Sequence, residues 1–264
     1  MRAPCSPCPD AHIPPLKVKS MHEFPLSRFP LPSRTMQTTA EVPRSVVDLA
    51  TLNVPLDSRR NLARAWLLLA LLALLASGFF SILLVLSRTP QLQALFSVAD
   101  FFRVALVVHV DLSVLVWFLA VGGAMWTLNG APRQPALAWL AFSLAATGTI
   151  VLCIAPFAEK AVPIMANYIP VLDGRLFTGG LLLFGTGVLL LCLHSMRVAL
   201  PVGTAIDFDA ALRFGLNAAL VSCVVSAIAF AASWRGLPAG LDPRVHYELL
   251  FWGGGHVLQF CYTL

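Results

Sequence analysis

Long apolar runs alternate with short polar breaks along most of this chain. Each run holds about 20 residues or more, the length that an α-helix needs to cross the hydrocarbon core of a bilayer. The breaks carry turn-forming Pro, Gly and Asn residues. The pattern predicts an all-α, polytopic transmembrane helical bundle with six spans, at Leu62–Leu86, Phe101–Leu128, Pro135–Phe157, Leu176–Leu200, Ala210–Trp234 and His246–Leu264.

The composition supports a membrane protein and excludes a soluble domain. Hydrophobic residues make up 58% of the 264 residues and charged residues 12%, about half of the roughly 25% that soluble domains carry. The mean hydropathy is +0.80. The formal net charge is only +5, and no run of Lys and Arg interleaved with aromatic residues indicates a nucleic-acid partner.

Residues 1–60 differ from the predicted transmembrane domain, residues 61–264. Prolines recur in this first segment and no apolar period holds, which is typical of a disordered tail. Arg59, Arg60 and Arg64 gather at the edge of the first span, and such a cluster favours the cytoplasmic side. We therefore expect a multi-pass protein of a bacterial-type inner (plasma) membrane, with a cytoplasmic amino-terminal tail.

Several other residues receive a structural interpretation. The connector between the third and fourth spans is apolar enough to pack on the membrane surface or against a partner. His194 and His246 lie near span ends, where we expect interfacial positions. Five tryptophans are interpreted as lipid-facing or interfacial belt residues: Trp66, Trp117, Trp126, Trp139 and Trp234.

Two histidines lie inside apolar spans, His109 in the second and His256 in the sixth. An imidazole in hydrocarbon is costly unless a partner satisfies it, so an ionisable group inside a membrane is a functional hypothesis by default. The usual partner of a neutral imidazole in a membrane site is a metal or a haem iron. In the predicted orientation both spans enter from the outer side, and both histidines lie roughly 12–15 Å from that end. They can therefore line one internal plane.

The sequences around both histidines resemble the catalytic subunit of haem–copper oxidases, subunit I of terminal oxidases such as cytochrome c oxidase. The second span contributes VALVVHVDLSVLVWFLAVGGAMW and the sixth FWGGGHVLQF, and the resemblance covers about residues 62–264. By this resemblance, His109 is the axial iron ligand of a low-spin haem b. His256 is a catalytic residue and a ligand of the copper beside a high-spin haem b.

The resemblance implies the amino-terminal half of a twelve-span respiratory oxidase subunit, ending after the sixth span. Such an enzyme takes electrons from a cytochrome c or a similar donor and reduces oxygen to water, with coupled proton uptake and translocation. It works in the membrane with other oxidase subunits. The family's further histidine ligands lie on the seventh and tenth helices, beyond Leu264, so we expect no oxidase turnover from these 264 residues alone.

Phe260 bears on the branch of the family. Many oxidases have a tyrosine four residues after the copper histidine, whereas cbb-type oxidases and nitric oxide reductases lack it, as this chain does. The resemblance therefore favours the interpretation of the chain as a cbb-like or divergent b-type oxidase, and the nearest alternative is a nitric-oxide-reductase-like or degenerate relative.

An alternative from another class is a six-span transporter or scaffold whose histidines are structural. His109 would then bond to a serine, to the backbone or to water. The three consecutive glycines before His256 would serve close helix packing rather than the approach of a haem edge.

Overall fold

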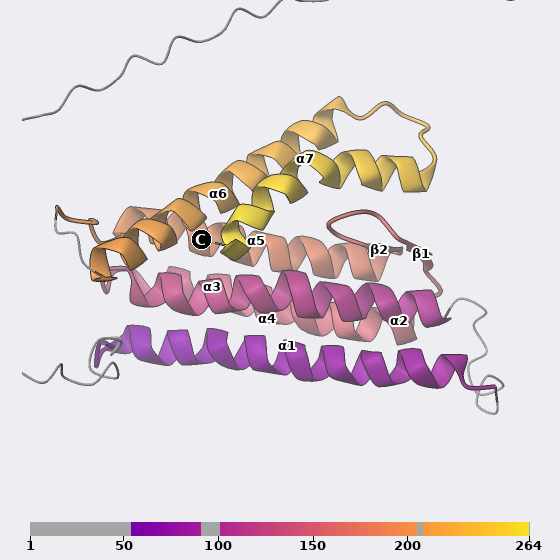
Figure 1. The fold of residues 1–264 in the computed structure, drawn as a ribbon, viewed down its shortest axis with the longest axis horizontal. Helices are drawn as coiled ribbons and strands as arrows, with labels where there is room; N and C mark the ends of the chain where they lie inside the picture. The colour runs from indigo at the N-terminus through magenta and orange to yellow at the C-terminus, as the bar shows by residue number, and fades with distance from the viewer. Residues whose placement is uncertain (1–53, 91–100, 205–207, 264) are drawn as a thin grey trace, which may run out of the picture. The chain divides into compact units, whose positions relative to one another are not determined.

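The computed structural model describes residues 54–90, 101–204 and 208–263, all within the unit Leu52–Leu264. These residues are mainly helical (Figure 1). The predicted disorder of the tail therefore concerns residues that lie mostly outside the described ranges. The helices are α1 (Ser58–Arg88), α2 (Phe101–Val110), the π-helix η3 (Asp111–Val116), α3 (Trp117–Leu128), α4 (Pro135–Ala158), α5 (Arg175–Val198), α6 (Phe208–Gly236) and α7 (Pro243–Thr263).

The predicted all-α architecture is confirmed. Within the described ranges, five helical stretches are long and apolar enough to cross a membrane: Ser58–Arg88, Phe101–Leu128, Pro135–Ala158, Arg175–Val198 and Phe208–Gly236. They match the first five predicted spans to within a few residues. The sixth, α7, begins at Pro243 rather than His246 and carries Arg244 and Glu248 in its first two turns. It is not among these five, and the count of six spans stays a prediction.

Local polar chemistry sets the start of α1. The helix begins at Ser58, inside the segment predicted as a tail. Asp57 is its N-cap and accepts a hydrogen bond from the backbone N–H of Arg59 at 2.9 Å. Hydrogen bonds from the Arg59 side chain lower the pKa of the Asp57 carboxyl below its ordinary value. A boundary drawn from apolar residues alone falls a turn too late, because the cap itself is polar.

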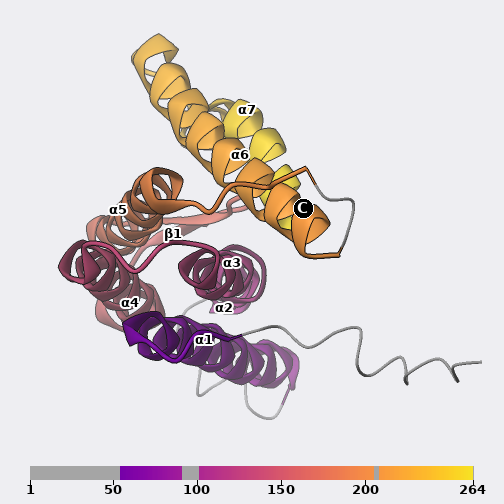
Figure 2. The ribbon, with the colours of Figure 1, turned by 90° about the vertical axis from the view of Figure 1, so that its left-hand side faces the viewer.

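The helices form a bundle and a hairpin. Helix α1, the continuous α2–η3–α3 helix, α4 and α5 pack together, and α6 and α7 lie antiparallel beside them (Figures 1 and 2). The α6–α7 hairpin contacts the bundle mainly through α5 and α3. Large apolar side chains point outward from several helices, for example Leu75 at 71% and Trp234 at 65% exposure. Apolar surface on this scale would be costly in water and suits contact with lipid.

Helices α4 and α5 pack backbone against backbone. A Cβ added at Gly148 would lie 2.4 Å from the backbone nitrogen of Phe184, and one at Gly187 would lie 2.5 Å from the backbone nitrogen of Ala145. Small residues allow such close approach in membrane bundles. The close packing of α4 against α5 holds both ends of the segment that connects these two helices and contacts α7.

The second span changes helix type immediately after His109. Residues Asp111–Val116 form a π-helix, and the Ser113 hydroxyl donates to the carbonyls of His109 at 2.7 Å and Val110 at 3.3 Å. A π turn inserts one extra residue into a helix and occurs frequently at functional sites. The apolar pattern of this span did not indicate it.

The connector between α4 and α5 forms a two-stranded antiparallel hairpin, β1 (Val162–Ile164) and β2 (Val171–Asp173). The Glu159 carboxylate before it accepts backbone N–H bonds from the first turn of α5, at 2.8 and 3.0 Å. The Tyr247 hydroxyl of α7 donates to Asp173 at 3.3 Å. The connector therefore packs against a later helix of the same chain.

Two of the tryptophans predicted to face lipid are buried. Trp66 is 0% and Trp126 is 2% exposed. Trp66 packs edge-to-face on Phe142, with ring centroids 5.4 Å apart, and its indole lies against Gly123. The prediction that they face lipid was wrong for these two, and for Trp66 the reason is that Gly123 on the facing helix leaves room for an indole inside the bundle. Trp139 and Trp234 are exposed as predicted.

His194 is 5% exposed, so the interfacial position expected for it was wrong. Its Nδ1 has no hydrogen-bond partner among the described residues.

Candidate functional site

His109 is held by a serine of the neighbouring helix α1. Its ring Nδ1 lies 2.9 Å from the Ser77 hydroxyl oxygen and 3.0 Å from the Ser77 carbonyl oxygen. The Ser77 hydroxyl also lies 3.0 Å from the His109 carbonyl oxygen, to which it donates. Ser77 is 2% exposed. The imidazole of His109 is therefore fixed by its own helix and by a serine of α1 that lies 32 residues earlier in the chain.

This arrangement determines which ring nitrogen is free. The Ser77 carbonyl can only accept, so Nδ1 carries the proton and donates it. In a neutral imidazole, Nε2 then holds the lone pair, and within the described residues it has no hydrogen-bond partner. Histidines that ligate metals typically donate the other ring N–H to a backbone carbonyl or a carboxylate. His109 therefore fits an axial iron ligand.

Asp111 lies two residues further on, at the start of the π-helix. It is 1% exposed, and neither carboxylate oxygen has a hydrogen-bond partner in the described part of the chain. A carboxyl group buried in this way is rare inside a membrane span and is a functional hypothesis by default. The apolar pattern of the span gave no indication of its burial.

His256 has a different environment. Its Nδ1 lies 2.7 Å from the Trp252 carbonyl of the preceding turn, and its Nε2 lies 2.6 Å from the Tyr168 hydroxyl. With Nδ1–H donating to Trp252, Nε2 accepts the Tyr168 hydroxyl proton. Tyr168 belongs to the β1–β2 connector and has a φ of 71°, a left-handed conformation that is uncommon for a tyrosine. The side chain of His256 is exposed in this structure.

The glycines before His256 make room for aromatic rings. A Cβ at Gly255 would lie 2.5 Å from Tyr168, and one at Gly254 would lie 2.3 Å from the ring of Phe230 on α6. Gly253 has nothing within 4 Å of the equivalent position. Side chains of the chain itself therefore account for two of the three glycines that were interpreted as room for a haem edge.

The structure gives each histidine its own hydrogen-bond partners, Ser77 for His109, and Tyr168 with Trp252 for His256. Among the residues described, no three His, Cys, Asp or Glu side chains form a group that could hold a metal ion. Measured along the helices, His109 lies about 12 Å from the start of α2 and His256 about 20 Å from the start of α7. Because α7 begins three residues earlier than predicted, His256 lies further along its helix than the sequence indicated, and the matching depth of the two histidines stays a prediction.

His256 fits copper less directly than His109 fits iron. Both of its ring nitrogens already have protein partners. Its Nε2 is available to a metal only when the Tyr168 hydroxyl moves away. One histidine also leaves the remaining copper ligands to be supplied from elsewhere.

Two bacterial proteins are similar to this chain. An uncharacterized protein of Rickettsia prowazekii is 30% identical over 233 residues, which cover 77% of this chain and 44% of the relative. An uncharacterized protein of Aquifex aeolicus is 26% identical over 195 residues, covering 74% of this chain and 49% of the relative. The chain thus spans about half the length of these curated relatives. No family model and no solved structure matches it.

Proposed function

We propose that this chain is the amino-terminal part of the catalytic subunit of a haem–copper oxidase of the cbb-like or divergent b-type branch. The resemblance of the two histidine-bearing spans supports the proposal. The structural observation that carries it is the Ser77 bond to Nδ1 of His109, which leaves Nε2 as the nitrogen that would hold a haem iron. When bound, the haems and copper would supply electron transfer from a cytochrome c or similar donor and the reduction of oxygen.

In this function the chain's own residues orient and support the ligands. Ser77 fixes the ring of His109 from α1, while Ser113 holds the backbone carbonyl of the same residue. The Tyr168 hydroxyl places a proton at Nε2 of His256 and keeps that ring turned toward the β1–β2 connector. The proposal further implies other oxidase subunits as partners and metal ligands outside these 264 residues.

One observation favours the alternative of a transporter or scaffold with structural histidines. Both ring nitrogens of His256 are satisfied by protein groups, so this imidazole needs no metal to be stable. In that function Tyr168 and Trp252 would be its permanent partners.

The test is a comparison of histidine variants in the complete subunit that this proposal implies, purified from the membranes of the cell that makes it. Reduced-minus-oxidised spectra and copper content are measured for the wild type, His109→Ala, His256→Ala and His246→Ala. His246 is a half-buried histidine near the start of α7, and its variant is the matched control. We expect His109→Ala to remove the low-spin haem band. We expect His256→Ala to remove copper and oxygen reduction while that band remains, and His246→Ala to behave as the wild type.

Other results of this comparison would favour the alternative functions. A wild-type protein without haem or copper would support the scaffold function. A low-spin band that survives His109→Ala would remove this residue from the haem, and unchanged copper in His256→Ala would remove that residue from the copper. Turnover with nitric oxide in place of oxygen would identify the reductase-like relative.

A further inference from the structure

The loop between β1 and β2 contains a strained turn that is centred on Tyr168. The Ile169 N–H donates to the Asn167 carbonyl two residues earlier, at 2.9 Å, and the φ of Tyr168 is 71°. These two features define a γ-turn with positive φ, which is the rare and strained form of this turn. A Cβ atom disfavours such a conformation, so it persists only where surrounding contacts hold it. Strained residues of this kind cluster at ligand clamps and switches.

Contacts with α7 hold the Tyr168 side chain in this conformation. Its hydroxyl oxygen lies 2.6 Å from Nε2 of His256, and the centroids of the two rings are 4.5 Å apart. The tyrosine also packs on Gly255, where an added Cβ would lie 2.5 Å from it. The loop residues Ala166 and Ile169 are buried separately, at 7% and 5% exposure. Tyr168 can therefore change conformation while the rest of the loop stays in place.

The same contacts occupy the lone pair of His256 that a metal cation would use. The ring Nδ1 donates to the Trp252 carbonyl at 2.7 Å, which leaves the lone pair of the neutral imidazole on Nε2. The Tyr168 hydroxyl donates its proton to that lone pair. His256 is otherwise exposed, so a cation can approach the ring. One lone pair cannot accept a hydroxyl proton and bind a metal at the same time.

We propose that the turn at residues 167–169 is a latch that controls the access of a metal cation to His256. In the closed latch the Tyr168 hydroxyl occupies Nε2. A cation that suits imidazole, such as copper, binds Nε2 only after the hydroxyl leaves. The turn then loses the hydrogen bond that holds its strained conformation, and it relaxes. The coupling is reciprocal, because the metal opens the latch by the same factor by which the closed latch weakens metal binding. The latch rests on the proposed function, since it regulates the histidine that would hold copper.

The experiment uses the detergent-purified full chain and a pentaammine-aqua complex of ruthenium(II) as the metal probe. Only the water of this complex exchanges, so it binds a single imidazole nitrogen and needs no other protein ligand. Mass spectrometry measures the rate of ruthenium addition to His256 and the hydrogen exchange of the Ile169 amide before and after addition. Tyr168→Phe removes the hydroxyl and keeps the ring. Tyr247→Phe is the matched control, because the Tyr247 hydroxyl also joins α7 to the connector but bonds to Asp173.

We expect ruthenium to add to His256 about tenfold faster in Tyr168→Phe than in the wild type or in Tyr247→Phe, since that variant lacks one hydrogen bond of the closed latch. In the wild type, ruthenium on His256 should speed the exchange of the Ile169 amide about tenfold for the same reason. Equal rates of addition in all three proteins, equal acceleration by both substitutions, or an Ile169 exchange rate that ruthenium leaves unchanged would each overturn the latch. These measurements need neither haem nor copper. A protein that contains neither but shows both effects would therefore keep the latch and lose only the proposed oxidase function.

Discussion

The backbone contact between α4 and α5 predicts opposite effects for two glycines of one helix. In Gly187→Ala the new methyl carbon would lie 2.5 Å from the Ala145 nitrogen and 2.6 Å from the Ala141 carbonyl oxygen. Ordinary contact begins at 3.4 Å, so the two backbones must move apart by about 1 Å. No rotamer change relieves a clash with backbone. Overpacking of this kind costs about 1–3 kcal/mol.

Gly185→Ala provides the control for this prediction. Gly185 is also in α5, and an added Cβ there has nothing within 4 Å. Both variants gain the same helix propensity, about 1 kcal/mol relative to glycine. The propensity therefore cancels in the comparison, and Gly187→Ala should be less stable than Gly185→Ala by about 1–3 kcal/mol.

The free energy of unfolding can be measured by titrating each variant with sodium dodecyl sulfate in mixed micelles while following helicity by circular dichroism. The wild type and both variants are compared at one detergent composition. Equal stability of the two variants, or a more stable Gly187→Ala, would refute the close packing of α4 against α5.

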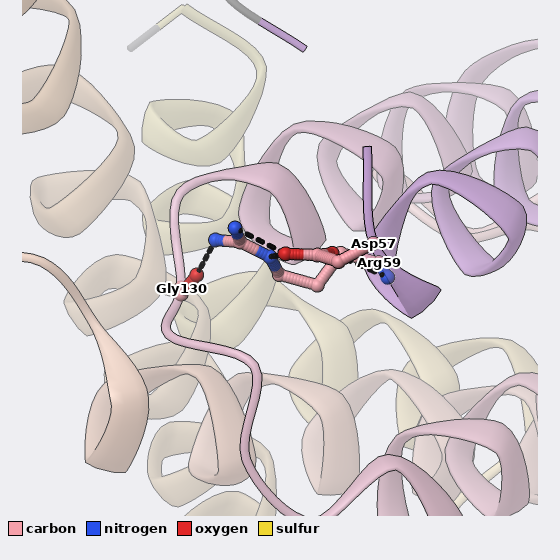
Figure 3. Close-up of polar contacts among 3 residues, drawn as sticks. All are labelled: Asp57, Arg59 and Gly130. Carbon is pink, nitrogen blue, oxygen red and sulfur yellow. Dashed lines mark hydrogen bonds and ion pairs between the residues drawn. The ribbon is translucent and has the colours of Figure 1, made fainter. Parts of the chain in front are cut away.

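Three further predictions use the same chain. Tyr168→Phe should speed carbethoxylation of His256 at Nε2, mapped by mass spectrometry, because the hydroxyl no longer occupies that nitrogen; an unchanged rate would contradict the bond. The pKa of the Asp57 carboxyl is lowered from 3.8 by Arg59 (Figure 3), so this pair stabilises the folded state above pH 3.8 and loses that effect as the pH falls through the pKa of the folded state. The thermal unfolding temperature of Asp57→Asn should therefore approach that of the wild type at about pH 3. An equal difference in unfolding temperature at about pH 7 and about pH 3 would count against this prediction. Alkaline carbonate should leave the protein in the membrane pellet, and a cysteine placed beside Arg60 should resist labelling from outside intact cells; release to the supernatant or outside labelling would contradict membrane integration or the orientation, respectively.

The helical architecture could be predicted because apolar length alone determines it. The second predicted span, Phe101–Leu128, coincides with the α2–η3–α3 helix, and the first, third, fourth and fifth spans differ from the helices by a few residues at one or both ends. Two of the ends that differ are set by residues outside the apolar pattern, the Asp57 cap of α1 and the Pro243 start of α7.

The partners of the candidate site could not be predicted in the same way. Ser77 lies 32 residues before His109, and Tyr168 lies 88 residues before His256. A pattern within one helix contains no information about which residue of another helix stands opposite. The inward position of Trp126 could not be predicted for the same reason. A tryptophan near a helix end can either face the membrane interface or turn into the bundle, and the sequence of its own helix does not distinguish the two.

The π turn after His109 also determines how the second span can vary between related chains. One extra residue in the turn rotates everything after it by about 100° relative to a regular α-helix. A single helical wheel therefore describes residues 101–110 or residues 117–128, but not both. Deleting one residue within Asp111–Val116 would keep the span helical and apolar, yet it would turn Gly123 away from Trp66 while leaving His109 against Ser77. A one-residue gap at this place in an alignment would thus indicate that the second half of the span is rotated about the helix axis relative to the first half.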